Sequence, residues 1–310
     1  MTTPAGPAPL IFGLYGEPPA ELADRPEGAV QFSPLIPGSA SLEDQSPASL
    51  AAMVMLAPPG TVERRYAMAQ ALRALAAAAP LTVLAPKDKG GSRLRKELEA
   101  FGCDVAEDAR RHHRICTTVR RASLAGVDEA IAAGAQQLVE PLGFWSQPGV
   151  FAWDRIDPGS ALLLEHLPPL AGRGADLGCG IGVLSRAVLA APAVTELTLV
   201  DLDRRAVDAA RRNIADPRAR FVWADLRREV AGLGGLDFVV TNPPFHDGGA
   251  EDRALGQAFV RRSASLLRRG GRLLLVANRH LPYEAALKAS FRSVALRVEA
   301  GGYKVYEAEA

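Results

Sequence analysis

Two short motifs in this chain carry residue types that could do chemistry together. Residues 242–245 read Asn-Pro-Pro-Phe and follow the apolar run 236–240, and a glycine loop, Asp176-Leu-Gly-Cys-Gly-Ile-Gly182, lies upstream of them. An Asn oxygen and a rigid Pro-Pro backbone offer two fixed hydrogen-bond acceptors at a strand end, while the glycine loop can hold a nucleoside cofactor. Either motif alone is common, but the combination points to methyl transfer onto a planar nitrogen.

The acceptor motif suits a nitrogen whose lone pair is delocalised into an aromatic ring. If the Asn242 oxygen and the Pro243 carbonyl accept its two N–H bonds, they orient the lone pair and stabilise the developing charge, so no strong base is required. Pro244 keeps the backbone rigid, and Phe245 would stack on the ring. The alternative is a plain Asn-Pro turn after a strand. The two prolines and the aromatic residue favour the functional interpretation.

The glycine loop predicts a cofactor site built on bare backbone. Gly178, Gly180 and Gly182 allow a tight strand-to-helix turn and let N–H groups approach a ligand without an intervening Cβ. These glycines stand at alternate positions after an acid, unlike Gly-x-Gly-x-x-Gly, which favours a ligand without a pyrophosphate. Asp176 could accept hydrogen bonds from an ammonium group, directly or through water.

Two further acids follow apolar runs downstream of the loop. Asp201 ends the run 197–200, where a carboxylate can accept both ribose hydroxyls. Asp225 ends the next predicted strand and suits an adenine amino group, with Trp223 or Leu226 packing on the ring. Both acids precede helix-like stretches, so helix capping is the alternative. Beside the glycine loop we favour the ligand roles.

Composition and charge narrow the classes of protein. The 310 residues are 48% hydrophobic and 23% charged, as in a globular protein, and exceed the usual length of one domain. A net charge of +1 gives no strong case for nucleic-acid binding by overall electrostatics, so any RNA contact would use local patches such as the basic stretch 110–114. No membrane segment or signal peptide is indicated, which predicts a cytoplasmic protein.

Cysteine and histidine spacing predicts neither disulfides nor a metal site. The three cysteines, Cys103, Cys116 and Cys179, form no Cys-x-x-Cys pair and fall in separate segments. The five histidines lack metal-ligand spacing. We therefore expect no bound metal.

Alternating strands and helices are predicted from about residue 50 onward, in two domains, 1–145 and 146–310, that meet in an aperiodic segment rich in Pro and Gly. Strands separated by helices pair in parallel, which predicts a doubly wound α/β sheet with its ligand site at the strand carboxyl ends. No role is predicted for residues 1–50. The predicted strands are 53–57, 81–85, 174–178, 196–201, 220–224, 236–241, 271–277, 293–298 and 303–308, and the main helices are 62–78, 92–101, 204–214 and 253–269.

A weak internal sequence similarity suggests that the first domain repeats part of the second. The segment 54–60, which contains Pro58-Pro59, aligns with 239–245, and the apolar strand 81–85 aligns with 273–277. The first copy lacks the Asn, the aromatic residue and an acidic glycine loop. Coincidence between short apolar runs is the alternative, and unrelated strand orders in the two sheets would end the idea of a duplication.

Residues 148–306 resemble the ribosomal RNA guanine-N2 methyltransferases of the small-subunit methyltransferase C (RsmC) type. The histidine after Asn-Pro-Pro-Phe and the closing Lys-Val-Tyr are the more specific features. The matching stretches are Pro148-Gly-Val-Phe151, Leu162-Leu-Leu164, the glycine loop, Asn242-Pro-Pro-Phe-His-Asp-Gly248, Val276-Ala-Asn278, Leu281-Pro-Tyr283 and Lys304-Val-Tyr306.

This resemblance implies a class I (Rossmann-like) methyltransferase sheet with a terminal antiparallel strand, preceded by a smaller degenerate domain of the same type with an RNA-binding or structural role. It implies S-adenosylmethionine as methyl donor and the N2 amine of a guanine in ribosomal RNA, preferably 16S, as acceptor. The partner would be the ribosomal RNA or the small ribosomal subunit. The residues do not reveal the oligomeric state, for which we expect a monomer. By position, Gly178, Gly180, Asp201 and Asp225 resemble cofactor ligands, and 242–245 the acceptor site.

Alternatives to this activity remain open on the residues alone. An Asn-Pro-Pro-aromatic motif suits any planar amine or amide, so a 23S rRNA guanine, an adenine N6 or a protein glutamine could be the acceptor. The chain could also be a catalytically idle binding module of ribosome assembly. The intact Asn242, Phe245 and Asp201 argue against an idle module, which would have no reason to bind S-adenosylmethionine.

Overall fold

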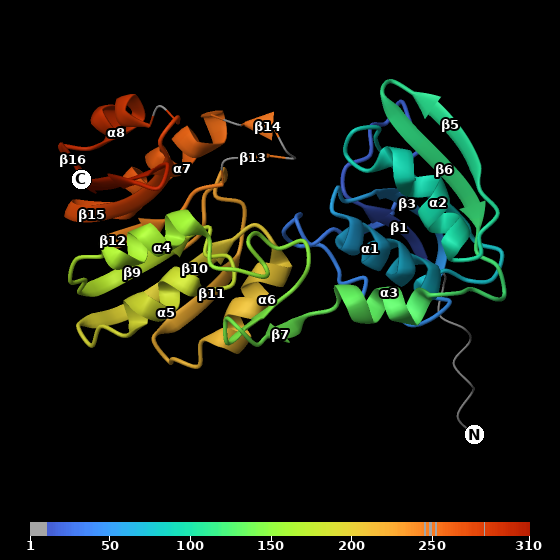
Figure 1. Ribbon diagram of the computed structural model, residues 1–310, viewed down its shortest axis with the longest axis horizontal. Coiled ribbons are helices and arrows are strands. Elements are labelled where there is room, and N and C mark those ends of the chain that lie inside the picture. The colour runs from blue at the N-terminus through green and yellow to red at the C-terminus, as the bar shows by residue number, and fades with distance from the viewer. Residues whose placement is uncertain (1–10, 245, 248–249, 252, 282) are drawn as a thin grey trace. The chain divides into compact units, whose positions relative to one another are not determined.

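The chain forms two compact units, each built on one large mixed sheet. The computed structural model describes residues 11–244, 246–247, 250–251, 253–281 and 283–310. Its contacts divide the chain into Met1–Ala135 and Gln136–Ala310 (Figure 1). The predicted arrangement of two α/β domains with related sheets is confirmed.

The second unit contains the predicted doubly wound sheet. Its seven strands lie in the order β11-β10-β9-β12-β15-β17-β16. The first five run parallel to one another, whereas β17 is antiparallel to both β15 and β16. The last strand of the chain, β17, is therefore the predicted terminal antiparallel strand, and it lies between β15 and the edge strand β16. The strand bounds are β9 Gly172–Leu177, β10 Val194–Asp201, β11 Ala219–Trp223, β12 Leu236–Thr241, β15 Leu267–Asn278, β16 Ser293–Ala300 and β17 Tyr303–Glu309.

Helices cover both faces of this sheet, and central strands are therefore apolar on both sides. Phe238 and Val240 of β12 pack into the cluster formed with α4, α5 and α6, while Val239 packs into the cluster formed with α7 and α8. A parallel strand buried on both faces reads as a largely apolar run, which is the pattern at 236–240 apart from Asp237. The Asp237 carboxylate accepts from the Arg173 N–H and pairs with Arg268. The helices are α4 Pro158–Glu165, α5 Val183–Leu189, α6 Arg204–Asn213, α7 Arg253–Leu266 and α8 Glu284–Ser290.

The division between the units lies before a short hairpin, β7 Gln137–Val139 and β8 Phe144–Ser146, which the sequence analysis had assigned largely to the first domain. Asn213 at the end of α6 donates to the Trp145 carbonyl at 2.9 Å and accepts from its N–H at 2.6 Å. The Arg212 guanidinium lies 3.4 Å from the centre of the Trp145 ring. These contacts fix the hairpin to the second unit, although its Pro- and Gly-rich surroundings resemble a linker.

The sheet of the first unit repeats the strand order of the second. Its order is β2-β1-β3-β4-β6-β5, with β1, β2, β3 and β4 parallel and β6 antiparallel to its neighbours β4 and β5. The succession β1-β3-β4-β6-β5 thus matches β9-β12-β15-β17-β16 in order and direction, as a duplication requires. The strands are β1 Ile11–Tyr15, β2 Val30–Gln31, β3 Leu50–Leu56, β4 Pro80–Pro86, β5 Ala106–Arg110 and β6 His113–Val119.

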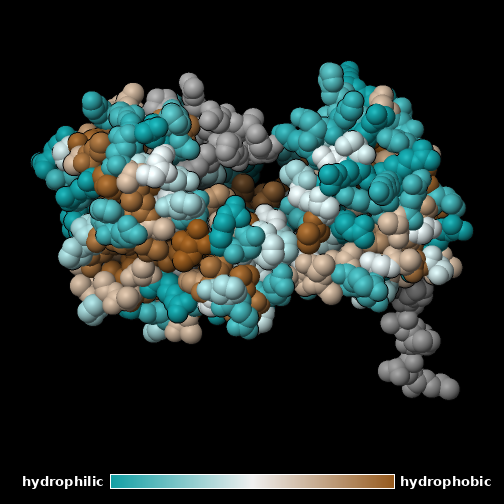
Figure 2. Space-filling view, in the orientation of Figure 1, coloured by the Kyte–Doolittle hydropathy of each residue, from teal (hydrophilic) through white to brown (hydrophobic). Residues whose placement is uncertain are grey.

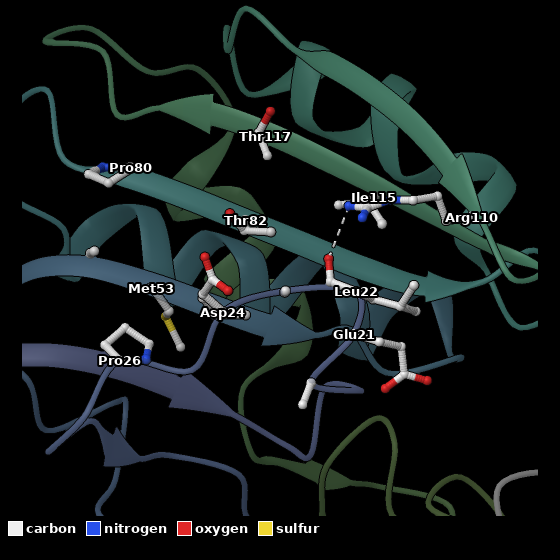
Figure 3. Close-up of a pocket in the computed structure, with 14 residues that line it drawn as sticks. Glu21, Leu22, Asp24, Pro26, Met53, Pro80, Thr82, Arg110, Ile115 and Thr117 are labelled. Atoms are coloured by element: carbon white, nitrogen blue, oxygen red, sulfur yellow. Dashed lines mark hydrogen bonds between the residues drawn. The ribbon is translucent and has the colours of Figure 1, made fainter.

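The first unit differs from the second in having helices on one sheet face only, within the part of the chain that the structure describes. α1 Thr61–Ala74, α2 Leu94–Ala100 with the preceding turn η1 Gly91–Arg93, and α3 Val127–Gly134 all pack into one cluster against the same face. On the opposite face a loop places Leu22 against Val54 and Ile115. Between this loop and the strands lies a cavity of about 420 Å³ lined by Asp24, Thr82 and other residues (Figure 3).

In the first unit, the place that corresponds to the acceptor motif is filled by an arginine. Pro58-Pro59 follows β3 as residues 243–244 follow β12, and the buried Arg64 guanidinium donates to the Pro59 carbonyl at 2.7 Å. Arg64 also donates to both carboxylate oxygens of Glu97 at 2.7 Å each. Because this ion pair occupies the strand end, the first unit offers no second acceptor site there.

On the face seen in Figure 2, hydrophilic residues predominate over the first unit, whereas hydrophobic and hydrophilic residues alternate over the second. Within the described ranges, no helix has the length and apolar character needed to cross a lipid bilayer.

Candidate active site

The two predicted motifs meet at the carboxyl ends of neighbouring strands. β9 and β12 pair in parallel, with Leu177 opposite Thr241, and the Thr241 hydroxyl donates to the Leu177 carbonyl at 2.6 Å. The next residues along are Gly178 and Asn242. A Cβ placed on Gly178 would lie 3.8 Å from the Asn242 carbonyl oxygen. The glycine loop and the acceptor motif therefore form one site.

The loop glycines adopt backbone conformations that other residues rarely take. Gly178, Gly180 and Gly182 have φ values of 73°, 53° and 90°. A Cβ on Gly182 would lie 2.8 Å from the Ile214 side chain, whereas one on Gly180 would meet no atom within 4 Å. Gly182 therefore allows the start of α5 to pack closely on Ile214 at the end of α6, while the backbone at Gly180 faces open space.

A pocket beside this loop brings together residues from three segments. It is lined by the loop, by Asn242 and by the segment 151–160 that leads into α4. Phe151 stands at its edge with 62% of its surface exposed. In the sequence this segment carries part of a family resemblance, but its side chains were not predicted to line the site.

Asp176 is a buried carboxylate with one oxygen unused. The Ser185 hydroxyl of α5 donates to its Oδ2 at 2.6 Å, whereas Oδ1 has no hydrogen-bond partner among the described residues. Burial raises the pKa of Asp176 to about 7, with a further increase from the charge of Asp201, against the hydrogen bond from Ser185. A buried, unpartnered acceptor of this kind suits a cationic ligand group.

We expect the ligand-free protein to lose stability as the pH rises, through this carboxyl group. Its ordinary pKa of 3.8 rises to about 7 in the fold, so the folded state binds the proton more tightly. The stabilising contribution is complete below about pH 4 and is lost as the pH approaches 7, at up to about 1.4 kcal/mol per pH unit.

The replacement Asp176→Asn should therefore reduce the decrease in Tm between pH 4 and pH 7, measured by thermal unfolding without ligand, and the raised pKa of Asp201 should account for what remains. Asp208→Ser, at an exposed site on α6, is the control for loss of a carboxylate. An equal slope for Asp176→Asn and the wild type would contradict the raised pKa.

Asp201 joins the glycine loop to the next strand end. Its Oδ2 accepts from the Gly180 N–H at 2.8 Å, and its Oδ1 accepts from the Asp203 N–H at 2.9 Å. Burial raises its pKa to about 6, although backbone hydrogen bonds act in the opposite direction. Each oxygen has a further lone pair, so Asp201 can still accept the hydroxyl groups of a ribose. The cap of α6 is provided by Asp203, whose Oδ1 accepts from the Arg205 N–H.

Asp225 lies at the end of β11 and is held by an arginine. Arg227 donates to it through its backbone N–H at 2.9 Å and through Nε at 3.0 Å. Partial burial raises the pKa of Asp225, but the hydrogen bonds from Arg227 outweigh this effect and hold the pKa below its usual value. The carboxylate is therefore ionised, with part of its capacity already used by Arg227.

In the Asn242 side-chain amide, the NH₂ group is hydrogen-bonded and the oxygen is not. Its Nδ2 donates to Asp157 Oδ2 at 2.8 Å and to Ser160 Oγ at 2.9 Å. Its Oδ1 is buried and has no partner in the described part of the chain. Pro243 is buried and Pro244 is exposed. Phe245, predicted to stack on the acceptor ring, lies outside the described residues.

Asp157, Ser160 and Ser185 were missed by sequence reasoning. Asp157-Pro158 before an apolar run is a recognisable helix start, with Asp as N-cap and Pro at the first helical position. That pattern predicts α4 but does not reveal what else the Asp contacts. Asp157 and Asn242 are 85 positions apart, so only the fold brings them together.

The closing Lys-Val-Tyr motif has a structural explanation. Lys304 Nζ and the Tyr306 hydroxyl of β17 both donate to Glu284 Oε1, at 2.7 and 2.5 Å. Partial burial raises the pKa of Glu284, but these two hydrogen bonds outweigh it and lower the pKa to about 2. The motif thus fastens the start of α8 to the antiparallel strand.

The basic stretch 110–114 lies at the turn between β5 and β6, and acids neutralise much of it. Arg110 pairs with Asp108 at 2.9 Å and Arg111 with Glu21 at 2.8 Å. A surface already occupied in this way offers a phosphate backbone fewer free cations. Metal ligands do not gather in the described parts of either unit, where no group of three or more His, Cys, Asp or Glu side chains could hold an ion.

The chain is similar to proteins of known family. The methyltransferase small domain family matches residues 141–307. A ribosomal RNA small subunit methyltransferase C from Pseudomonas entomophila (strain L48) is 34% identical over 254 residues, covering 81% of this chain and 76% of the relative. A protein of the same name from Shewanella loihica (strain ATCC BAA-1088 / PV-4) is 39% identical over 160 residues, covering 51% and 46%.

One solved structure resembles the chain over its full length. It is the T. thermophilus 16S rRNA N2 methyltransferase RsmC in complex with AdoMet and guanosine. The TM-score is 0.78 at 25% sequence identity, and the match covers 100% of this chain and 89% of that one. The likeness therefore includes both units.

Proposed function

Since this chain belongs to the ribosomal RNA small subunit methyltransferase C family, within the methyltransferase small domain family, we propose that it methylates the exocyclic N2 amine of a guanine in 16S ribosomal RNA. It is an S-adenosylmethionine-dependent methyltransferase. We further propose that it acts in the cytoplasm, as a monomer, on ribosomal RNA or the small ribosomal subunit. The relative with bound guanosine supports guanine over the other planar nitrogens.

The observation that carries the proposal is the unpartnered Asn242 Oδ1 beside the glycine loop. This oxygen is buried, faces away from the two groups that hold the amide, and lies at the strand end next to Gly178. A buried acceptor without a donor is costly unless a ligand supplies one. An aromatic amine supplies that N–H.

On the other side of the site, the glycine loop and the three carboxylates fit the methyl donor, S-adenosylmethionine. We propose that Gly178, Gly180 and Gly182 present backbone to it, that Asp176 Oδ1 meets its ammonium group directly or through water, and that Asp201 and Asp225 bind ribose and adenine. The observation that supports the role of Asp176 is its buried Oδ1, which has no hydrogen-bond partner among the described residues. S-adenosylmethionine, when bound, supplies an electrophilic methyl group.

The acceptor residues then act by orientation and charge. Asn242 Oδ1 and the Pro243 carbonyl accept the two amine N–H bonds, which directs the nitrogen lone pair and stabilises the positive charge that develops during transfer. Pro244 limits movement of this backbone, and Phe245 stacks on the base. No ionisable base is needed, because the proton is acidic once nitrogen carries the methyl group and can pass to water.

A methylation assay on defined RNA tests the proposal. Purified protein should transfer one labelled methyl group to 16S rRNA or small subunits from cells that lack the protein, and nucleoside mass analysis should give N2-methylguanosine. N6-methyladenosine, methylated glutamine or label only in 23S rRNA would replace the proposed substrate. No transfer to any of these, together with no binding in an S-adenosylmethionine titration, would identify an idle module.

A further inference from the structure

We propose that Asp157 and Ser160 are positioning residues that lock the Asn242 amide with its oxygen towards the nucleotide, so that this part of the site can only accept hydrogen bonds. The inference rests on the proposed function, because it concerns how the same site selects an amine. Both residues lie at the start of α4, and strand β9 separates this helix from the glycine loop in the chain.

Every N–H of the Asn242 side chain is already used within the fold. A primary amide has two N–H donors, and here one goes to Asp157 Oδ2 at 2.8 Å and the other to Ser160 Oγ at 2.9 Å. No donor is left for a substrate. The one free group of the amide is Oδ1, which is buried and without a partner in the described part of the chain.

The charge of Asp157 decides which way the amide points. An ionised carboxylate only accepts hydrogen bonds, so a rotated Asn242 would place its oxygen against the Asp157 oxygens and lose both N–H bonds. The carboxylate thus holds one of two amide orientations that have nearly the same shape. Its negative charge also polarises the amide and increases the electron density on Oδ1, which faces the developing charge.

Asp157 is itself held rigidly, as a positioning residue must be. The same Oδ2 accepts from the Ser160 N–H at 2.9 Å and caps α4, which begins with Pro158. Gly159 permits close approach, since a Cβ there would lie 2.8 Å from the Tyr303 ring of β17. α4 packs on β17 and on β15, and β15 pairs directly with β12, the strand that leads into Asn242. Asp157 therefore moves with the sheet.

The consequence is selectivity for a hydrogen-bond donor at this point. An exocyclic amine offers N–H to Oδ1, whereas a ring carbonyl, such as O6 of guanine, would meet another acceptor. A base turned so that its carbonyl faces Asn242 is rejected, because the amide cannot rotate to offer its NH₂ group. The Asp157–Ser160 pair thus sets which edge of the base enters the site.

Helix capping is the competing role of Asp157, and two substitutions separate it from positioning. Ser and Asn both cap helices well, but only Asn carries an oxygen far enough out to accept from Asn242 Nδ2. If positioning matters, Asp157→Ser should lower kcat about 10- to 100-fold with KM for RNA and the Kd for S-adenosylmethionine within a few-fold. Asp157→Asn should recover only part of that kcat, because its oxygen can accept from Asn242 Nδ2 whereas its own NH₂ group also permits the opposite amide orientation. Tm should stay near the wild-type value in both.

A double-mutant comparison and an NMR measurement separate the loss of amide positioning from a loss of stability. In the Asn242→Ala background, Asp157→Ser should cause no further loss, because the amide that it positions is absent. Ser160→Ala keeps the backbone N–H that donates to Asp157 and should give a smaller loss of kcat. With Asn-selective ¹⁵N labelling, the Asn242 NH₂ protons should exchange faster with water in Asp157→Ser than in wild type.

Several outcomes would overturn the inference and leave the proposed function intact. These are wild-type kcat in Asp157→Ser, equal losses of kcat in the Ser and Asn variants, or full additivity with Asn242→Ala. Asp208→Ser, which removes an exposed carboxylate from α6, is the matched control and should change neither kcat nor the amide signals. Failure of the wild-type protein to methylate guanine would instead contradict the proposed function.

Discussion

Asn242→Ala is expected to lower kcat for RNA methylation by about 100- to 1,000-fold while leaving the Kd for S-adenosylmethionine within a few-fold. The Asn242 oxygen gains most of its value as charge develops on the amine, so its removal affects the transition state more than ground-state binding. The measurements are single-turnover kinetics on 16S rRNA and a calorimetric titration of the donor.

This variant needs a control for folding, because its substitution leaves two polar side chains without their partner. Removing the Asn242 amide leaves Asp157 and Ser160 without the two donors at 2.8 and 2.9 Å, so thermal unfolding must show that the second unit stays folded. Its tryptophan fluorescence is a suitable signal. Turnover equal to that of the wild type would contradict the chemistry assigned to Asn242.

Arg64→Ala is expected to destabilise the first unit by about 3–5 kcal/mol. The replacement leaves the Glu97 carboxylate buried without its partner, and it removes the donor that the Pro59 carbonyl receives. Trp145, Trp153 and Trp223 are the only tryptophans and all lie in the second unit. Urea unfolding should therefore show an early circular dichroism transition without a matching change in tryptophan fluorescence.

Two further variants identify the cause of this loss. Arg64→Met combined with Glu97→Leu removes both charges and should restore most of the stability, because apolar side chains of similar volume can replace a buried ion pair. Arg95→Ala breaks an Arg–Glu pair on α2 whose side chains are about half exposed, and it should leave the transition unchanged. An Arg64→Ala transition at the wild-type urea concentration would contradict a structural role for the pair.

Elements with strong local signals agree closely with their predicted bounds. β12 spans Leu236–Thr241, as predicted, because a strand buried on both faces is apolar over most of its length. α6 spans Arg204–Asn213 against a predicted 204–214, with Asp203 as the cap. The antiparallel pair of β5 and β6 was not predicted, because all five residues of β5 are exposed and show no alternation.

The carboxyl ends of two helices were harder to place from the sequence. α1 was predicted to continue to residue 78 but ends at Ala74, after which Leu75 forms a bridge with Leu50 of β3. α7 was predicted to reach 269 but ends at Leu266, where β15 begins. In both places helix propensity favours continuation, and pairing with a strand that is distant in sequence ends the helix.

The sequence by itself determined the parallel sheet of the second unit and the meeting of the glycine loop with the Asn-Pro-Pro motif, and it suggested the duplication that the strand orders support. Parallel strands with right-handed crossovers place their carboxyl ends at one edge, so motifs that follow two such strands must converge. Only the tertiary structure decided that Asp157 and Ser160 hold the Asn242 amide, and that Arg64 and Glu97 fill the corresponding place in the first unit. These contacts join residues 85, 82 and 33 positions apart, and their geometry depends on how helices pack on the sheet, which local periodicity does not encode.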